Sequence, residues 1–135
     1  MRARFLAPVA AVTAFLALAV VTSAHHSFAA EYDRNKPVTL TGTVTKVEWQ
    51  NPHIYFYLDV KGSDGTVENW AIEGGAPNAL YRAGWRKDSL QAGNAVTVDA
   101  WLAKSGERLA NMRSVVLADG RRVLGGSSAG DQNPN

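Results

Sequence analysis

The sequence predicts an all-β domain with one short helix, arranged as a small five-stranded antiparallel barrel of the OB type. Three observations lead to this fold class. Segments in which apolar residues alternate with Thr and other polar residues follow one another through the chain, as in half-buried strands. One helical segment separates the third of these strands from the fourth, which is the element order of an OB barrel. Gly42 interrupts the first strand, where a strand shared by two sheets must bend.

Each element has its own local signal. In the first strand Leu40 and Val44 alternate with threonines, and in the second Ile54, Phe56 and Leu58 form an apolar face. A turn at residues 63–65 joins the second strand to the third, and residues 74–75 (Gly-Gly) end the third. The helix has Pro in its first turn and Gly just past its end. The predicted strands are 38–49, 53–61, 66–73, 95–103 and 108–117, with an edge strand at 121–124 and the helix at 77–83.

The same strands allow a second topology. An open antiparallel sandwich or meander would use the same alternation and the same turns. Gly42 favours the barrel, because a sharp bend in a long first strand lets that strand pair on both sides.

The N-terminal region has the pattern of a secretory signal peptide. Arg2 and Arg4 precede an uncharged apolar run, and small residues at 22–24 are suitable for cleavage after Ala24. Cleavage after Ala29 is an alternative. We therefore expect a periplasmic or secreted protein with a signal peptide at 1–24, an N-terminal segment at 25–37, the β-domain at 38–124 and a disordered tail at 125–135.

Composition narrows the classes of partner. The chain has 14 Lys+Arg and 12 Asp+Glu, and the predicted signal peptide carries the two excess arginines, so the exported domain has no net charge. No basic stripe remains to neutralise phosphates, which argues against a nucleic-acid partner. The chain has no cysteine, so its apolar core must hold it together without disulfides. No second apolar segment follows the signal peptide, so we expect no membrane partner after cleavage.

Several segments together resemble one family of small exported bacterial proteins, catalogued as domain of unknown function 6152. They are HHSFAAEYD, KPVTLTGTVTKVEW, NPHIYFYLDV, NWAIEGG and LADGR, and they extend from His25 to about Leu124. HHSF and NPH are the most specific of them. Gly93-Asn94 departs slightly from the Gly-Asp that OB-like proteins of this kind often have before the fourth strand. The resemblance implies export and a compact β-domain, and it implies no activity.

The chain has three histidines, and all three lie in the HHSF and NPH motifs: His25, His26 and His53. Cleavage after Ala24 would give His25 a free α-amine beside its imidazole, so that two nitrogens could chelate one metal ion. A further imidazole would complete a roughly planar three-nitrogen site, which suits Cu(II) best among the common divalent metals. The arrangement is similar in ligand type to the histidine brace of exported copper proteins. The alternative is that these histidines are solvated, or that His53 only caps a turn.

An extended N-terminal segment is long enough to run back along the first strand to His53, with Phe28 and Tyr32 as packing anchors. A helical turn in this segment would shorten it and could prevent the meeting, and His25 and His26 would then have to bind metal without His53.

A second hypothesis uses an aromatic face. Tyr55, Tyr57 and Trp70 could line the ligand face of an OB barrel and bind a small ligand or a protein of the cell envelope. Ordinary packing is the alternative for these residues, and Trp85 and Trp101 are expected in the core or beside the helix. The sequence contains no nucleophile motif and no phosphate-binding loop, which favours a binding protein over an enzyme. A redox enzyme built on the same copper site is a third, weaker alternative. Glu48, Asp59 and Glu73 are expected to be solvated carboxylates.

Overall fold

A computed structural model of the chain describes residues 26–125, and the predicted signal peptide, His25 and most of the predicted tail lie outside this range. Of His26 and Ser27 only the backbone is described. Strands dominate the described residues, which confirms the all-β prediction. In chain order the elements are α2 (His26–Glu31), β1 (Tyr32–Glu48), β2 (Tyr55–Lys61), β3 (Val67–Glu73), α3 (Pro77–Arg82), β4 (Ala95–Ala103), β5 (Leu109–Val116) and β6 (Arg122–Leu124).

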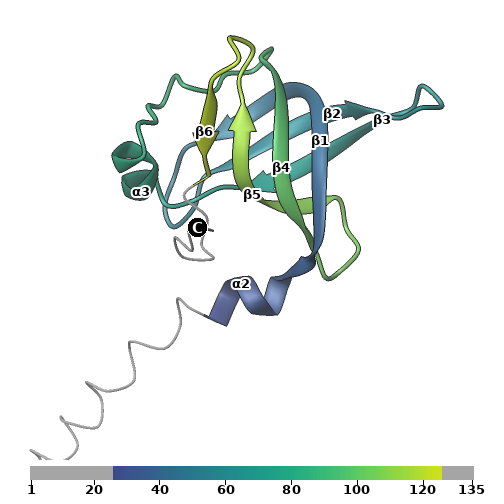
Figure 1. Cartoon of the computed structure of the whole chain (residues 1–135), viewed down its shortest axis with the longest axis horizontal. Helices are drawn as coiled ribbons and strands as arrows, with labels where there is room; N and C mark the ends of the chain where they lie inside the picture. The colour runs from purple at the N-terminus through teal and green to yellow at the C-terminus, as the bar shows by residue number, and fades with distance from the viewer. Residues whose placement is uncertain (1–25, 126–135) are drawn as a thin grey trace, which may run out of the picture.

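The strands form one six-stranded sheet in the order β3-β2-β1-β4-β5-β6. All neighbours in this order are antiparallel, and a parallel pairing of β3 with β5 joins β1, β2, β3, β5 and β4 into a closed ring. Figure 1 shows the hairpin of β2 and β3 projecting beyond this ring, with α2 lying beneath one end of the ring and α3 at its side.

β1 belongs to both halves of the ring, and Gly42 marks the change from one half to the other. Residues 37–43 pair with β4, whereas residues 43–48 pair with β2. A Cβ atom at Gly42 would collide with the backbone carbonyl of Asp59 on β2, so the two strands approach too closely for any side chain here. The predicted role of Gly42 at the bend agrees with this geometry.

β1 also begins earlier than the sequence predicts. The strand starts at Tyr32, which pairs with Ala103 at the end of β4, instead of at residue 38. Residues 33–37 are mostly exposed and include a register shift, so they lack the apolar alternation from which a strand is predicted. β2 begins at Tyr55, two residues later than predicted.

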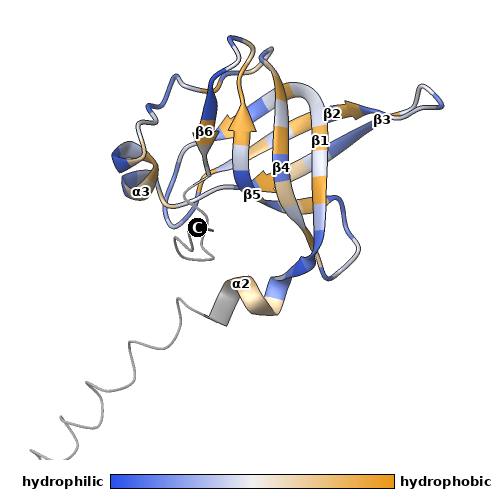
Figure 2. Cartoon of the chain, in the orientation of Figure 1, coloured by the Kyte–Doolittle hydropathy of each residue, from blue (hydrophilic) through white to orange (hydrophobic). Residues whose placement is uncertain are grey.

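One apolar cluster fills the inside of the ring. Figure 2 shows hydrophobic and hydrophilic positions alternating along the strands that supply it. Ile54, Phe56, Leu58 and Trp85 are fully buried, which agrees with the predicted inner face of β2 and with the core position of Trp85. A second, smaller cluster lies at the α2 end. It consists of Phe28, Tyr32 and Ala103, with Trp101 and Leu109 packed against it, so Trp101 lies outside the main core.

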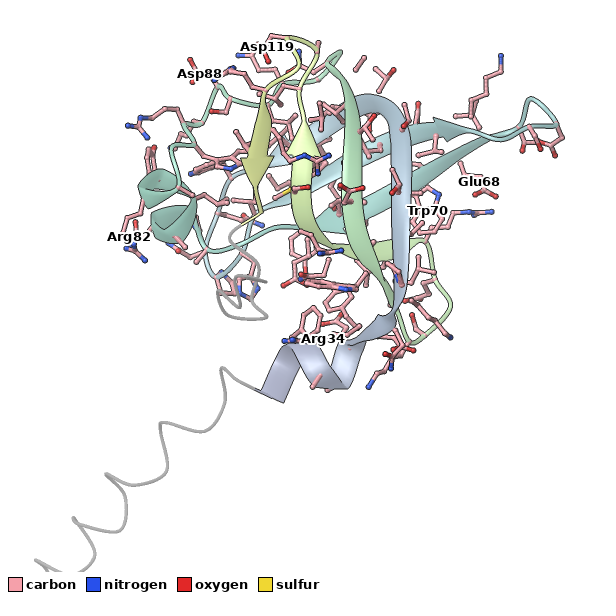
Figure 3. All side chains as sticks on the ribbon, in the orientation of Figure 1. Arg34, Glu68, Trp70, Arg82, Asp88 and Asp119 are labelled. Atoms are coloured by element: carbon pink, nitrogen blue, oxygen red, sulfur yellow. The ribbon has the colours of Figure 1, made fainter. Side chains whose placement is uncertain are left out.

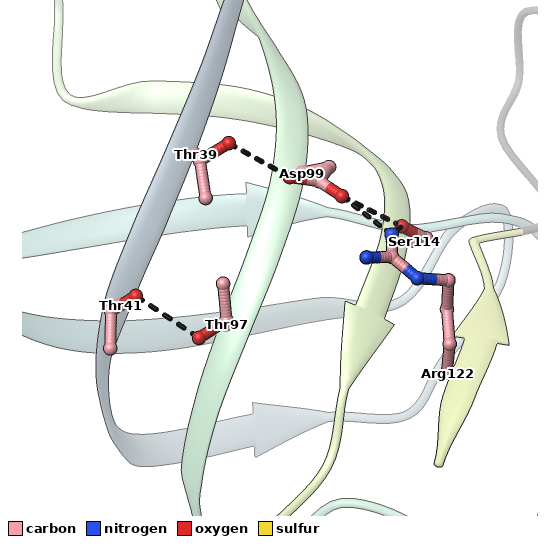
Figure 4. Close-up of polar contacts among 6 residues, drawn as sticks. All are labelled: Thr39, Thr41, Thr97, Asp99, Ser114 and Arg122. Atoms are coloured by element: carbon pink, nitrogen blue, oxygen red, sulfur yellow. Dashed lines mark hydrogen bonds and ion pairs between the residues drawn. The ribbon is translucent and has the colours of Figure 1, made fainter. Parts of the chain in front are cut away.

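A polar network on the outer face ties four strands together (Figure 4). The Asp99 carboxylate on β4 accepts hydrogen bonds from Thr39 Oγ1 on β1 (2.8 Å), Ser114 Oγ on β5 (3.3 Å) and Arg122 Nη1 on β6 (2.6 Å). These contacts, with that of Arg122 first, hold the pKa of Asp99 below its usual value. The network therefore attaches the three-residue strand β6 to the sheet.

We expect Asp99→Asn to lower the free energy of unfolding by about 1 kcal/mol near neutral pH, because the side chains are only partly buried. A carboxylate with a depressed folded-state pKa stabilises the fold above its unfolded pKa, and this contribution disappears as pH falls. The difference between wild type and variant in urea unfolding should therefore be full above about pH 4 and close as the pH falls through the lowered pKa of Asp99. Thr41→Val is the matched control, because it removes a neutral hydrogen bond to Thr97 on the same face. A gap for Asp99→Asn that is equally large at low pH would contradict this role.

Candidate functional site

A buried carboxylate at the α2 end of the ring brings together side chains from separate parts of the chain. Glu73, the last residue of β3, is only 4 % exposed. Its Oε2 accepts a hydrogen bond from the Tyr32 hydroxyl, and its Oε1 lies 2.6 Å from His53 Nδ1. Tyr55 on β2 is paired directly opposite Glu73 and completes the cluster. We call Tyr32, His53, Tyr55 and Glu73 the Glu73 cluster.

The strand register explains why these residues meet. On β2 and β3, Phe56 pairs with Ile72, and both side chains are buried in the core. Side chains alternate along a strand, so the neighbouring pair of Tyr55 and Glu73 points to the other face. His53 immediately precedes this part of β2, after a cis peptide bond between Asn51 and Pro52.

Burial and hydrogen bonding change the proton affinity of both tyrosines. Burial, followed by the charge of Glu73 and a side-chain hydrogen bond to it, raises the pKa of Tyr55 to about 12. Burial and the hydrogen bond to Glu73 raise the pKa of Tyr32 strongly. Both hydroxyls therefore stay protonated at neutral pH and remain hydrogen-bond donors.

α2 is attached to the ring beside the Glu73 cluster. Phe28 on α2 is buried, and its ring centroid lies 5.5 Å from that of Tyr32 and 5.3 Å from that of Trp101. The Arg34 guanidinium covers Phe28 at 5.0 Å, and Figure 3 shows Arg34 next to α2. The backbone N–H of Lys104 donates to the Glu31 carbonyl at 2.8 Å. The predicted anchoring by Phe28 and Tyr32 is confirmed, although a helix replaces the predicted extended path.

An open hollow of about 420 Å³ lies on the α2 side of the cluster, lined by Ala30, Glu31, Lys104, Ser105, Glu107 and Leu109. Partial burial and the nearby carboxylates of Glu73 and Glu107 raise the pKa of Glu31, and the charge of His53 lowers it. Glu31 thus lines the hollow and interacts electrostatically with Glu73 and His53 of the Glu73 cluster. The carboxylates of Glu31, Glu73 and Glu107 lie close enough to repel one another.

The structure brings together some of the residues that the sequence predicted for a site. His53 and Tyr55 both belong to the Glu73 cluster. Tyr57 lies further along the same face of β2 and donates a hydrogen bond to Glu48 Oε2 at 3.0 Å. Trp70 pairs with the buried Leu58 and packs against the main core, so it points to the opposite face from Tyr55 and Tyr57. Figure 3 places Trp70 with Glu68, on the side of the ring away from α3.

The predicted metal ligands are only partly described. His53 is half-buried, with its side chain 25 % exposed. His25 and the imidazole of His26 lie outside the described residues. Within residues 26–125 no group of three or more His, Asp or Glu side chains is placed to hold a metal ion. No helix in that range is long and apolar enough to cross a membrane.

The prediction that Glu73 is a solvated carboxylate is wrong. The side chain is buried with hydrogen-bond partners. The hairpin register could have predicted the position of Glu73, because a turn centred on Asp64 pairs position 55 with position 73. That register would have placed Glu73 beside Tyr55, which is two residues from His53.

Comparison with known proteins gives a family and a distant structural likeness. A family of unknown function (DUF6152) matches residues 13–112, so the chain belongs to this family. No curated protein matches. Among solved structures, the mitochondrial single-stranded DNA binding protein Rim1 from S. cerevisiae is similar with 12 % identity and a TM-score of 0.49. The likeness covers 62 % of this chain and 93 % of that one.

We expect the alkaline titration of the protein to show the two perturbed tyrosines of the Glu73 cluster, beside Tyr57, whose pKa is raised by its hydrogen bond to Glu48. Free tyrosine ionises near pH 10, whereas Tyr55 in the folded protein should lose its proton only near pH 12. A raised folded-state pKa stabilises the fold below the unfolded pKa, so stability should fall as pH rises above about 10. Tyr55→Phe should remove one late step from the tyrosinate absorbance curve and make the alkaline loss of stability less steep. A curve in which all four tyrosines ionise together near pH 10 would contradict the burial of the cluster.

Proposed function

We propose that this member of the DUF6152 family is an exported, non-enzymatic binding protein of OB-like architecture that binds a metal ion, Cu(II), through His53 and the N-terminal histidines His25 and His26. The observation that carries the proposal is the contact between His53 Nδ1 and the buried carboxylate of Glu73. The pattern of residues 1–24 supports export, and with it the free amine of His25.

The strand order supports the OB-like assignment. The ring runs β1, β2, β3, β5, β4 and back to β1, and α3 lies between β3 and β4 in the chain. OB folds bind ligands on the face of their second and third strands, between the loops that follow the first and fourth strands. The Glu73 cluster occupies this region, because His53 ends the first of these loops and the hollow beside Glu31 includes the second.

The environment of His53 resembles that of a metal-binding histidine. Such histidines nearly always donate one ring N–H to a carboxylate, carbonyl or water, which directs the other nitrogen at the metal. In this protein Glu73 engages Nδ1, so Nε2 is the nitrogen left for a ligand, and a quarter of the side chain is exposed. The carboxylates of Glu31 and Glu107 add negative potential on the same side of the protein.

The N-terminal segment also reaches the Glu73 cluster. Tyr32 follows α2 directly and donates to the same carboxylate that contacts His53. Phe28 of HHSF packs on Tyr32, and Tyr32 and His53 of NPH both contact Glu73, which supports an approach of the two motifs at this end of the ring. An amine and imidazoles from His25, His26 and His53 form the nitrogen donor set that suits Cu(II), and all of these groups can deprotonate near neutral pH.

The aromatic-face hypothesis has weaker support. Trp70 packs on the other face from Tyr55 and Tyr57, so the three residues do not form one surface. Tyr55 and Tyr57 remain available for a small ligand or an envelope protein, and this is the alternative function if metal binding fails.

We expect a native mass spectrum of the protein exported by its own signal to show a chain that begins at His25 and holds one Cu(II). His53→Gln removes the imidazole and keeps a polar partner for Glu73. It should lower copper affinity at least about 100-fold, since loss of a ligand costs more than loss of an outer partner. A chain that begins at Ala30, or one that begins at His25 and stays free of copper, would contradict the proposal.

The role of the terminal amine has its own control. A chain with one alanine inserted before His25 keeps all three imidazoles but moves the amine out of the chelate ring. Its copper affinity should fall at least about tenfold if amine and imidazole of His25 bind together. Equal affinity in the two chains would remove the amine from the site and leave only the imidazoles.

A further inference from the structure

Glu73 contacts two side chains, His53 and Tyr32, which are held in place by different parts of the chain. His53 follows the loop after β1, whereas Tyr32 is fixed by α2 and by the end of β4. Each of them occupies a different oxygen of the carboxylate. A buried carboxylate held at both oxygens has little freedom to rotate, so the position of one partner affects the other.

The chemistry of the carboxylate determines which ring nitrogen of His53 carries the proton. An ionised carboxylate can only accept hydrogen bonds, so the nitrogen that faces it must be the N–H. With Nδ1 facing Oε1 at 2.6 Å, a neutral imidazole has its proton on Nδ1 and its lone pair on Nε2. Nε2 is then ready to bind a metal ion without a change of tautomer.

The docking of α2 determines the position of Tyr32. The rings of Phe28 and Tyr32 are in contact within the second apolar cluster, and Lys104 holds the end of α2 through two hydrogen bonds to Ala29 and Glu31 carbonyls. The Tyr32 hydroxyl, directed by this packing, occupies Oε2 of Glu73. Oε1 is thereby left to His53.

We propose that Glu73 is a positioning residue that fixes the His53 imidazole as the Nδ1–H tautomer, and that Tyr32 couples this tautomer to the docking of α2. The same helix that leads to His25 and His26 thus sets the nitrogen that the third imidazole presents. The identity of the ligand on Nε2 rests on the proposed copper function, and the tautomer itself does not.

The test is the ¹⁵N NMR spectrum of the three imidazoles in the metal-free protein, with His53→Gln used to assign the His53 signals. In spectra recorded at a pH where the imidazole signals are those of neutral rings, we expect the proton of wild-type His53 on Nδ1. In Glu73→Gln the side chain has a donor as well as an acceptor, so the second tautomer should appear. A proton on Nε2 in the wild type, or an unchanged tautomer in Glu73→Gln, would overturn the positioning role.

Tyr32→Phe tests the coupling, because it keeps the ring in the apolar cluster and removes only the hydroxyl. Without the hydroxyl the Glu73 carboxylate is free to rotate away from Nδ1, so we expect the second tautomer to appear. Cu(II) binding should weaken about 10- to 100-fold, the usual cost of losing an outer partner. Tyr81→Phe is the matched control, since Tyr81 is exposed on α3, contacts Trp49 edge to face, and lies on a helix at the side of the ring away from α2 (Figure 1). If Tyr32→Phe gives the same spectrum as Tyr81→Phe, the coupling is wrong.

The two proposals fail in different ways. A wild-type spectrum with the Nδ1–H tautomer and no copper uptake would leave the positioning role in place and remove the copper function. Copper uptake with the Nε2–H tautomer in the metal-free protein would support the copper function and remove the positioning role. Glu73→Gln is the more disruptive variant, and if it does not fold, the wild-type tautomer and Tyr32→Phe still decide the question.

Discussion

The close contact of β1 with β2 at Gly42 is the constraint on which the rest of the structure depends. Because Gly42 has no side chain, its backbone can lie against the Asp59 carbonyl of β2. β1 can therefore bend here and pair with β4 before the bend and with β2 after it. The ring then closes where Ala71 to Glu73 of β3 run parallel to Leu109 to Asn111 of β5. This closure places the start of β1, the end of β3 and the start of β2 at one end of the ring. The Glu73 cluster is therefore a consequence of ring closure.

Much of the fold follows from patterns within single segments. The alternation in residues 95–103 gave β4 with the same bounds, and the other strands were predicted to within two residues except at the start of β1. Pro77 and Gly84 mark α3 because one restricts the first turn and the other takes a positive φ after the end. These signals are local, since a few neighbouring residues determine each of them. The inner face of β2 follows from the alternation along that strand, whereas Trp85 lies in the loop after α3 and was expected in the core from its residue type alone.

The site depends on contacts between segments, and these were harder to predict. His53 and Tyr55 were singled out by residue type alone, whereas Glu73 required the register of the hairpin as well. The docking of α2 required more still, because residues 33–37 have no strand alternation and the Lys104 backbone contributes to the contact. The spacing of Phe28 and Tyr32 is the i, i+4 spacing of a helix face, which is the one local sign of α2. His25 and the imidazole of His26 stay predictions, since they lie outside the described residues.

The electrostatics of the α2 end distinguish between classes of ligand. Glu31, Glu73 and Glu107 interact strongly enough that their repulsion contributes, after burial, to a raised pKa of Glu31. The Lys104 ammonium is engaged with the Ala29 carbonyl, and His53 is engaged with Glu73. Bringing an anion to this end would add to the repulsion among the carboxylates, whereas a cation would relieve it. A neutral ligand would gain nothing from this field. The arrangement of charge thus supports the proposed cation at His53, and this support is separate from the argument from ligand type on which the proposal of copper rests.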